Sequence, residues 1–326
     1  MTVLVADKLE QSALDGFKAL GCEVVSDPDL SDSALHDALV KTGAEVLVVR
    51  STKVPAEVQA GTSLRMVLRA GAGYNTIDVD AATVNGVWVA NCPGKNSVAV
   101  AELAIGLLLA LDRFIPDNVG ELRAGKWNKK KFGKARGLFG RTLGLVGFGS
   151  IGREMVPRAR ALGMDVVVYS GHLSDAEAAS LGVRKAASLE GLARESDAVS
   201  LHVSMRPETK AMIGKAFFDA MRPGAYFVNT SRGEVVVQSD LLAATASGKI
   251  TAALDVFDGE PTTPEADYDG ELRSAKGVYV THHIGASTEQ AQEAVAAEAV
   301  RIVDVFMRTG TPPNAVNEPE GVRSKG

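Results

Sequence analysis

Leu143–Tyr169 reads LGLVGFGSIGREMVPRARALGMDVVVY, and this stretch decides the fold. It begins with an apolar run typical of a strand and turns through the glycine motif at 147–152. Apolar residues then recur at helical spacing before a second strand-like run ends the stretch. A strand, a glycine-rich turn, a helix and a strand in this order predict a dinucleotide-binding unit rather than a turn with only a structural role.

Each glycine of this motif has a physical task. Gly147 permits the tight turn, and Gly149 lets the backbone approach a pyrophosphate. Gly152 lets the following helix lie close to the strand. The N–H groups at the head of that helix, around Ser150 and Ile151, then face the anion. The motif therefore predicts where the phosphates of a cofactor bind.

Composition and charge exclude several classes of protein. The 326 residues carry 35 Lys and Arg against 40 Asp and Glu, a net charge of -5, which argues against a nucleic-acid-binding protein. Cys22 and Cys92 are too few for a disulfide framework or a cysteine-built metal site, so we expect a reducing compartment and no metal. The longest apolar run, Leu103–Leu111, is too short to span a bilayer, and the first residues lack a basic leader. We expect a soluble, cytoplasmic protein with no membrane partner.

Strand and helix patterns alternate on both sides of the glycine motif. ALGCEVV at 19–25 echoes ALGMDVV at 161–167, which indicates two domains of similar construction. The predicted fold class is α/β, with two Rossmann-like or flavodoxin-like domains, parallel sheets and an active-site cleft between them. Helices at 98–111 and 288–306 have room to carry the chain across and back. We expect a substrate-binding domain of residues 1–96 plus 289–326 and a dinucleotide-binding Rossmann domain of residues 97–288.

Three chemically capable side chains follow strand-like runs in the second half of the chain: Arg232, Glu260 and His283. Ligands gather at the carboxyl ends of parallel strands, so these residues can meet in one site. Arg offers a planar fork for a carboxylate, His exchanges a proton near neutrality, and a carboxylate beside the His holds its tautomer. Taken alone, each residue has a plainer interpretation: Arg232 as a surface ion-pair residue, Glu260 as part of a solvated turn and His283 as a structural histidine. Downstream of a dinucleotide motif, the three together indicate a hydride-transfer site.

The sequence around these three residues resembles the D-2-hydroxyacid dehydrogenase family, and the likeness extends over nearly the whole chain. Its catalytic motifs are matched by NTSRG at 229–233, ALDVFDGEP at 253–261 and HIGAST at 283–288. The resemblance implies that Arg232 binds the substrate carboxylate and keto oxygen. It also implies that His283 is the acid/base and that Glu260 is its partner.

The same resemblance implies further contacts with cofactor and substrate. Cofactor contacts are implied at Gly147, Gly149, Ser150, Ile151, Gly152, Ser170, His202, Thr230, Asp255 and Gly285. Substrate contacts are implied at Arg50, Ser51, Arg69, Ala72, Gly73, Arg232 and His283. Asp255 matches a family position near the nicotinamide amide. The opposite wall of the cleft would be formed by Arg50, Ser51, Arg69 and the loop 70–73.

Several motifs, among them RAGAG at 69–73 and KWNKKKF at 126–132, resemble the D-3-phosphoglycerate dehydrogenase branch of the family. The implied reaction is NAD(P)-dependent oxidation of 3-phospho-D-glycerate to 3-phosphohydroxypyruvate in serine biosynthesis. The resemblance also implies a homodimer joined through the dinucleotide-binding domain. We expect the short form, without a C-terminal regulatory domain. Lys129–Lys131 are either a solvated face or a source of positive charge for a substrate phosphate, and the sequence leaves both open.

Ser170 departs from the dinucleotide-binding pattern. An acidic residue is expected at this place to accept a hydrogen bond from the ribose 2′-hydroxyl, and its charge repels a 2′-phosphate. With serine here, that repulsion is missing, so NADP is left open, and NAD is expected because the resemblance implies it. Ser170 makes a glyoxylate or hydroxypyruvate reductase an alternative to the implied function. A second alternative, outside the enzymes, is an NAD(H)-sensing co-repressor of the same fold.

Overall fold

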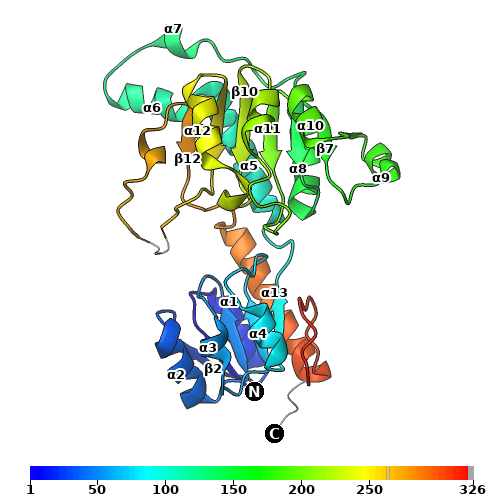
Figure 1. Ribbon diagram of the computed structural model, residues 1–326. Helices are drawn as coiled ribbons and strands as arrows, with labels where there is room; N and C mark the ends of the chain where they lie inside the picture. The colour runs from blue at the N-terminus through cyan, green and yellow to red at the C-terminus, as the bar shows by residue number, and fades with distance from the viewer. Residues whose placement is uncertain (262, 264, 322–326) are drawn as a thin grey trace. The chain divides into compact units, whose positions relative to one another are not determined.

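The computed structural model describes residues 1–261, 263 and 265–321, and the chain divides into two compact units (Figure 1). The first unit consists of Met1–Asn96 and Ser287–Gly326, and the second of Ser97–Ala286. The chain leaves the second unit after Ala286, two residues before the boundary that we predicted after residue 288. The head of the helix α13 (Glu289–Thr309) explains the difference, because Thr288 Oγ1 caps it by accepting a hydrogen bond from Ala291 N at 3.1 Å.

A five-stranded parallel sheet in the order β2-β1-β3-β4-β5 forms the centre of the first unit. The central strand β3 reads VLVV, and its four side chains are buried on both faces of the sheet. The edge strand β2 reads EVVS and is exposed at both ends. One face of the sheet packs against Phe17 and Phe306 of α1 and α13, and the other against Leu35 of α2. The strands are β1 (Thr2–Val5), β2 (Glu23–Ser26), β3 (Val46–Val49), β4 (Met66–Arg69) and β5 (Trp88–Asn91). The other helices are α1 (Gln11–Ala19), α2 (Asp32–Thr42), α3 (Ala56–Gln59) and α4 (Val79–Val84).

A seven-stranded parallel sheet in the order β12-β11-β10-β9-β6-β7-β8 forms the centre of the second unit. Leu108 of α5 and Met155 of α8 pack on one face, and Phe217 of α11 packs on the other. The strands are β6 (Thr142–Val146), β7 (Asp165–Tyr169), β8 (Arg184–Lys185), β9 (Ala198–Leu201), β10 (Ala225–Asn229), β11 (Ile250–Leu254) and β12 (Val278–Val280). The α-helices are α5 (Ser97–Arg113), α6 (Ile115–Arg123), α7 (Lys129–Phe132), α8 (Ser150–Ala161), α9 (Asp175–Ser180), α10 (Leu189–Glu195), α11 (Lys215–Ala220) and α12 (Gln238–Ala246). The 3-10 turns are η1 (Gly233–Val235) and η2 (Glu271–Ser274).

The strand order reverses once in each sheet, at β1 in the first unit and at β6 in the second. In open parallel sheets, the chain connections leave in opposite directions at such a point and open a crevice at the carboxyl end of the strand. The predicted fold class of two parallel-sheet α/β domains is therefore confirmed. The two reversal points also indicate where ligand-contacting loops can gather in each unit.

Both cysteines are buried free thiols. Burial raises the pKa of the Cys92 thiol to about 12, so this residue stays protonated at neutral pH. The described residues contain no group of three or more His, Cys, Asp or Glu side chains arranged to hold a metal ion. None of the helices in this part of the chain combines the length and the apolar character needed to cross a bilayer.

Candidate active site

The glycine motif lies at the carboxyl end of β6, where the strand order of the second unit reverses. Gly147 has a φ of +93°, and a Cβ added to it would collide with the backbone carbonyl of His202. A Cβ on Gly152 would lie 2.8 Å from the carbonyl oxygen of Gly147. A Cβ on Gly149, by contrast, would meet nothing within 4 Å. Packing within the unit therefore requires the first and last glycines, while the surface over Gly149 is open to an approaching group.

The residues around this open surface fit a dinucleotide. α8 begins there with Gly149 as its N-cap, and no side chain caps its free N–H groups. His202 follows β9, the strand next to β6, and Thr230 follows β10, the strand after that. Both ring nitrogens of His202 and the Oγ1 atom of Thr230 are buried without a hydrogen-bond partner in the described structure. Burial lowers the pKa of His202 to about 3, so its ring is neutral and keeps one donor and one acceptor. Unpartnered buried polar groups next to an amide-rich anion site are what a nucleotide would satisfy.

Ser170 directly follows β7, at the same edge of the sheet. Its Oγ accepts a hydrogen bond from the backbone N–H of His172 at 3.2 Å, so the serine closes a local turn. Both Ser170 and His172 are exposed or half-buried, and neither brings a negative charge to the end of β7. The repulsion that a carboxylate at this place exerts on a 2′-phosphate is therefore missing.

Glu260 and His283 form a hydrogen-bonded pair in the second unit. His283 Nδ1 lies 2.7 Å from Glu260 Oε2, and the other carboxylate oxygen, Oε1, accepts a hydrogen bond from Phe257 N at 2.8 Å. The His283 side chain is 52% exposed and that of Glu260 is 25% exposed. A carboxylate held on one side by the backbone and on the other by an imidazole keeps the Nε2 atom of that imidazole free to exchange a proton.

Asp255 holds the turn that carries His283. It follows β11, is 1% exposed, and accepts hydrogen bonds from Thr281 Oγ1 at 2.6 Å and from Ile284 N at 2.9 Å on Oδ1. Its Oδ2 atom accepts a hydrogen bond from Gly285 N at 2.8 Å. His283 itself has a φ of +53°, in the left-handed region that residues other than glycine occupy uncommonly, although histidine does so more often than most. The contacts of Asp255 thus lie on both sides of a strained residue and stabilise its backbone.

Arg232 follows β10, the strand next to β11, in a loop that Asn229 holds. Asn229 Oδ1 accepts hydrogen bonds from Ser231 N at 3.0 Å and Ser231 Oγ at 2.8 Å, and its Nδ2 donates to Arg232 O at 2.9 Å. The Arg232 side chain donates from Nη1 to Ser231 O at 2.6 Å. The next residue, Gly233, packs so closely that a Cβ would collide with the carbonyl group of Phe257. The loop of Arg232 therefore rests on the segment whose N–H holds Glu260.

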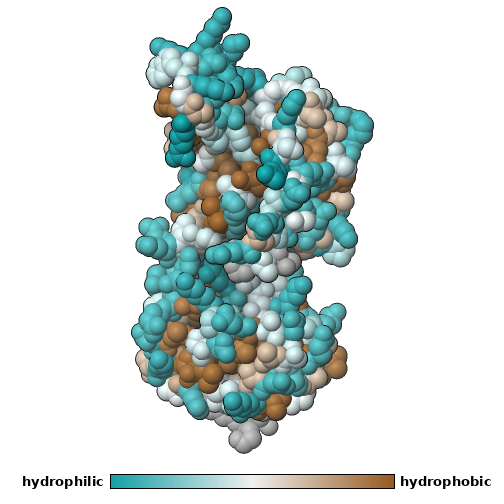
Figure 2. All heavy atoms as spheres, turned by 90° about the vertical axis from the view of Figure 1, so that its left-hand side faces the viewer, coloured by the Kyte–Doolittle hydropathy of each residue, from teal (hydrophilic) through white to brown (hydrophobic). Residues whose placement is uncertain are grey.

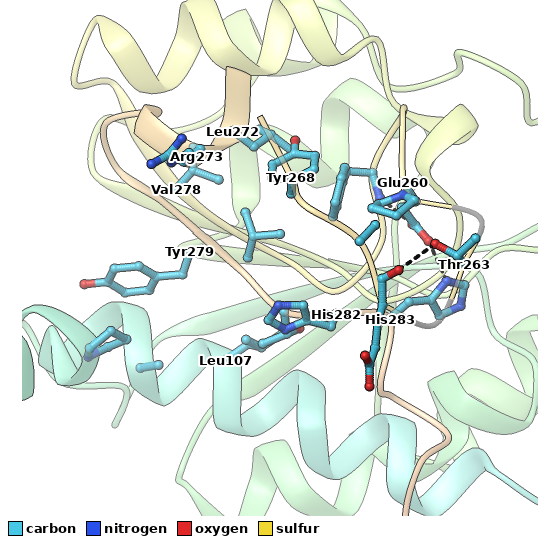
Figure 3. A pocket seen from close by; sticks show the side chains of 18 residues that line it. Leu107, Glu260, Thr263, Tyr268, Leu272, Arg273, Val278, Tyr279, His282 and His283 are labelled. Carbon is cyan, nitrogen blue, oxygen red and sulfur yellow. Dashed lines mark hydrogen bonds and ion pairs between the residues drawn. The ribbon is translucent and has the colours of Figure 1, made fainter. Parts of the chain in front are cut away.

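A cavity of about 810 Å³ lies beside the Glu260–His283 pair, within the second unit (Figure 3). Leu107 of α5 and Tyr279 of β12 line it, together with Tyr268 and Leu272 of the segment that follows Glu260. At its far side Tyr279 Oη donates a hydrogen bond to Asp117 Oδ2 at 2.6 Å, which joins β12 to α6. The pair thus borders a hollow that apolar and polar side chains line together.

The residues with implied substrate contacts in the first half of the chain lie at the carboxyl edge of the first unit's sheet. Arg50 and Ser51 follow β3, and Arg69 ends β4. In the loop that holds Ala72 and Gly73, the Ala72 carbonyl accepts a hydrogen bond from Asn91 Nδ2 at 2.6 Å. These residues share one edge of one unit, and Arg232, Glu260 and His283 share one edge of the other.

Lys129–Lys131 form α7, a single turn with no buried residue. Lys131 Nζ makes an ion pair with Glu121 Oε1 at 2.6 Å, which raises the pKa of this lysine. Asn128 caps the turn by accepting a hydrogen bond from Lys131 N at 3.1 Å. The positive charge of Lys131 is thus balanced within the unit, and that of Lys129 and Lys130 faces solvent.

Comparison with known proteins decides the relationship. The family model described as "D-isomer specific 2-hydroxyacid dehydrogenase, NAD binding domain" matches residues 105–285, more than half of the chain. This chain belongs to the D-isomer specific 2-hydroxyacid dehydrogenase family. The matched residues lie within the second unit, which is the NAD-binding domain of the family. The resemblance inferred from the motifs is therefore confirmed.

Members of the family with curated names are similar along most of the chain. D-3-phosphoglycerate dehydrogenase of Methanocaldococcus jannaschii is 38% identical over 320 residues, which are 97% of this chain and 59% of that protein. Hydroxypyruvate reductase of Thermotoga maritima is 42% identical over 275 residues, 83% of this chain and 88% of that protein. The holo form of D-mandelate dehydrogenase from Rhodotorula graminis is 30% identical, with a TM-score of 0.88 and 98% of each chain covered. This chain thus spans less than two thirds of the length of the phosphoglycerate dehydrogenases that it matches.

Sequence reasoning missed the polar residues that hold the loops of this family member in place. Asn229 holds Arg232, Asn91 holds the loop of Ala72, and Asp7 contacts the loop after β3. Each stands at or just after the carboxyl end of a buried strand, and that position was the only signal in the sequence. The backbone groups that these side chains bind belong in part to neighbouring strands and loops. A single sequence does not show which strands are neighbours.

Proposed function

We propose that this chain is an NAD(P)-dependent D-2-hydroxyacid dehydrogenase. The observation that carries the proposal is the 2.7 Å hydrogen bond between Glu260 and His283, one strand away from the loop of Arg232. An acid/base pair and a guanidinium at the same sheet edge as an open glycine loop are the groups that hydride transfer to a 2-keto acid requires. We assign dinucleotide binding to the second unit and substrate contacts to the first.

The mechanism follows from the properties of these side chains. The cofactor, when bound, supplies the hydride acceptor for oxidation and the hydride for reduction. In oxidation, Nε2 of His283 takes the proton of the C2 hydroxyl. Glu260, bonded to Nδ1, holds the tautomer and stabilises the imidazolium that forms. Arg232 binds the substrate carboxylate and the developing keto oxygen through its N–H groups, and in reduction His283 returns the proton.

The substrate that we propose is 3-phospho-D-glycerate, oxidised to 3-phosphohydroxypyruvate in serine biosynthesis. Its support is the 38% identity with a D-3-phosphoglycerate dehydrogenase over 97% of this chain. Lys129 and Lys130 are the candidates for the substrate phosphate, since Lys131 is engaged by Glu121. The Lys129→Ala/Lys130→Ala variant should raise KM for phosphohydroxypyruvate but not for hydroxypyruvate, which lacks the phosphate. An equal KM for phosphohydroxypyruvate in variant and wild type would leave the two lysines as a solvated face.

A second candidate function is reduction of hydroxypyruvate or glyoxylate. Two observations favour it: Ser170 leaves the end of β7 without the carboxylate that excludes NADPH, and a hydroxypyruvate reductase is 42% identical over 88% of its own length. The chemistry of Arg232, Glu260 and His283 is the same for either substrate. The two candidate functions differ only in the coenzyme and in the group that the keto carbon of the substrate carries besides the carboxylate.

We propose that the enzyme acts in the cytoplasm as a homodimer joined through the second unit. α6 exposes three apolar side chains, Ile115 at 48%, Val119 at 43% and Leu122 at 56%, and Trp127 beyond it is 81% exposed. Figure 2 shows hydrophobic residues gathered on the face of this unit that includes α6 and β12. Sedimentation of the Val119→Glu/Leu122→Glu variant should give a monomer. Val84→Glu, at an exposed site of the first unit, is the matched control and should not change the mass.

A panel of initial rates tests the proposed reaction. Phosphohydroxypyruvate, hydroxypyruvate, glyoxylate and pyruvate are each offered with NADH and with NADPH. We expect the highest kcat/KM with phosphohydroxypyruvate, and a preference for hydroxypyruvate or glyoxylate would establish the second candidate. A protein that binds NADH and reduces none of the four would instead support the co-repressor interpretation. Arg232→Lys should lose most of the activity, because an ammonium cannot reproduce the planar fork.

A further inference from the structure

Asp7 stands directly after β1, the strand at which the order of the first unit's sheet reverses. β1 pairs with β2 on one side and with β3 on the other, so the carboxyl end of β1 faces the loop that follows β3. This is the crevice in which open parallel sheets bind their ligands. Two of the implied substrate residues, Arg50 and Ser51, lie in that loop.

The Asp7 carboxylate binds every residue of the segment 50–52. Its Oδ2 atom accepts hydrogen bonds from three successive backbone N–H groups: Arg50 at 2.6 Å, Ser51 at 3.1 Å and Thr52 at 3.0 Å. Its Oδ1 atom accepts a fourth from Ser51 Oγ at 2.7 Å. Thr52 Oγ1 closes the arrangement by donating to the carbonyl oxygen of Ala6 at 3.1 Å. Three consecutive N–H groups that converge on one oxygen form an anion-binding concavity, and here the anion is part of the chain.

The charge of Asp7 is maintained by these contacts. Burial acts to raise the pKa of the Asp7 carboxyl, but the hydrogen bonds from the Arg50 and Thr52 backbone and from the Ser51 hydroxyl outweigh it. The net result is a pKa below the usual value, so Asp7 is ionised at neutral pH. Hydrogen bonds to an ionised acceptor are about twice as strong as those between neutral groups. The segment is therefore held by a charged group, although Ser51 is exposed.

The contacts of Asp7 also determine which groups of the loop remain available to a ligand. The Ser51 hydroxyl donates a hydrogen bond to Asp7, so it can only accept a hydrogen bond from a substrate. The N–H groups of 50–52 are likewise engaged. The guanidinium of Arg50 keeps its donors, with one contact from Nη1 to Gln292 Oε1 at 3.4 Å. Of the two implied substrate residues in the loop, only Arg50 can donate hydrogen bonds to an anion.

We propose that Asp7 is a positioning residue, which holds the segment 50–52 so that the Arg50 guanidinium meets the anionic end of the 2-hydroxy acid. This inference rests on the proposed function, because it assigns Arg50 to the substrate of that reaction. Asp7 does not touch the substrate. Because Asp7 already holds the segment 50–52, the backbone of Arg50 does not lose further freedom when the substrate binds.

Asp7→Asn is the variant that tests the proposal. The amide keeps the size of the side chain but removes the charge, so the bonds from the three N–H groups lose their charge-assisted strength. It also replaces the acceptor of the Ser51 hydroxyl by an NH₂ donor, so that bond cannot form in its present direction. We expect KM for the keto acid to rise about 10- to 100-fold, with kcat within about threefold and the Kd for NADH unchanged. Hydrogen exchange of the amides of 50–52 should become faster in the variant, which reports the loosened loop directly.

Two further variants keep the test sharp. Ser51→Ala removes one of the four bonds and should raise KM by a smaller factor than Asp7→Asn. Asp27→Asn is the matched control: Asp27 follows β2 at the same edge of the sheet, and among the described residues its carboxylate accepts a hydrogen bond from Asp29 N alone, at 3.3 Å. It should leave KM, kcat and the exchange of 50–52 as in the wild type.

The outcomes separate the two proposals. A wild-type protein that reduces none of the four keto acids would overturn the proposed function, and the substrate role of Asp7 with it. An active wild type with an unchanged KM in Asp7→Asn would overturn the inference alone. A variant that loses kcat and NADH affinity together, or that unfolds, would show Asp7 to be structural only, provided that Ser51→Ala also leaves KM unchanged.

Discussion

Asp255 Oδ2 accepts a hydrogen bond from the backbone N–H of Gly285 at 2.8 Å, and this contact helps to hold the left-handed turn at His283. The residues are 30 positions apart and meet because β11 and β12 are neighbours. Asp255 also accepts hydrogen bonds from Thr281 Oγ1 and Ile284 N of the same turn. Among the described residues that contact this turn, Asp255 is the one buried carboxylate. The conformation of the proposed acid/base thus depends on a side chain one strand away.

Asp255→Asn should therefore reduce activity through His283. The amide can accept on one oxygen only, so either the Gly285 N–H or the pair of Oδ1 contacts is left unsatisfied in a site that is 1% exposed. We expect kcat to fall by about 10- to 100-fold and the free energy of unfolding by about 1–3 kcal/mol. Thr281→Val removes only the Oγ1 bond and should cost less on both counts. A kcat equal to that of the wild type in Asp255→Asn would contradict the role assigned to this contact.

His283→Asn should remove the proton transfer and leave the nucleotide site intact. General acid–base catalysis contributes roughly 10²–10⁴-fold, so kcat should fall by about that factor. NADH titration should give a Kd near that of the wild type, since the glycine motif and the N-terminus of α8 are not altered. The neighbouring His282→Asn is the control and should retain activity. If NADH binding fell in His283→Asn while turnover remained, the acid/base role would be wrong.

Ser170→Asp tests coenzyme choice by binding, without turnover. The wild type should bind NADH and NADPH with affinities within about tenfold, because no carboxylate repels the 2′-phosphate. The aspartate should weaken NADPH binding by about 10- to 100-fold and leave NADH binding equal or tighter. Ala179→Asp places the same charge on the exposed side of α9 and should change neither affinity. Equal loss of both coenzymes in Ser170→Asp would mean that the site is merely disturbed.

Glu298 should make the stability of the first unit depend on pH. The Arg301 guanidinium lowers the pKa of Glu298 to about 2, assisted by Asn314 and Lys95 and opposed by burial. A folded-state pKa below the usual 4.5 means that the stabilisation is complete above about pH 4.5 and is lost as the pH falls toward 2. The shift corresponds to roughly 3 kcal/mol, in a side chain that is 7% exposed.

Glu298→Gln should accordingly lower the free energy of unfolding of the first unit by about 1–3 kcal/mol at pH 7. The difference from the wild type should shrink as the pH falls from about 5 to about 2. Asp304→Asn, which breaks the exposed pair with Arg308 on the same helix, should cost less than about 1 kcal/mol at any pH. Denaturant unfolding at several pH values measures both variants. A deficit in Glu298→Gln that does not change with pH would contradict the assigned cause.

The sequence by itself determined the α/β class, the two parallel-sheet domains and the glycine motif of this protein. These features are written in local patterns: an apolar run such as VLVV in β3 forms a buried strand, and Gly147 permits its turn, because of properties within a few residues. Arg232, Glu260 and His283 could also be selected, since each follows a strand-like run and belongs to a recognisable motif. α6 was not predicted, because its nine residues include a proline, a glycine and several charged side chains, although Ile115, Val119 and Leu122 recur at helical spacing.

Only the tertiary structure decided which polar groups meet. Asp7 binds residues 43–45 positions away and Asp255 binds residues 26–30 positions away, in both cases across adjacent parallel strands. Parallel strands are joined by long crossovers, so strand adjacency, and with it each hydrogen-bond partner, is a property of the folded sheet. The left-handed φ of His283 has the same origin, because the backbone adopts a strained conformation only where contacts such as those of Asp255 stabilise it.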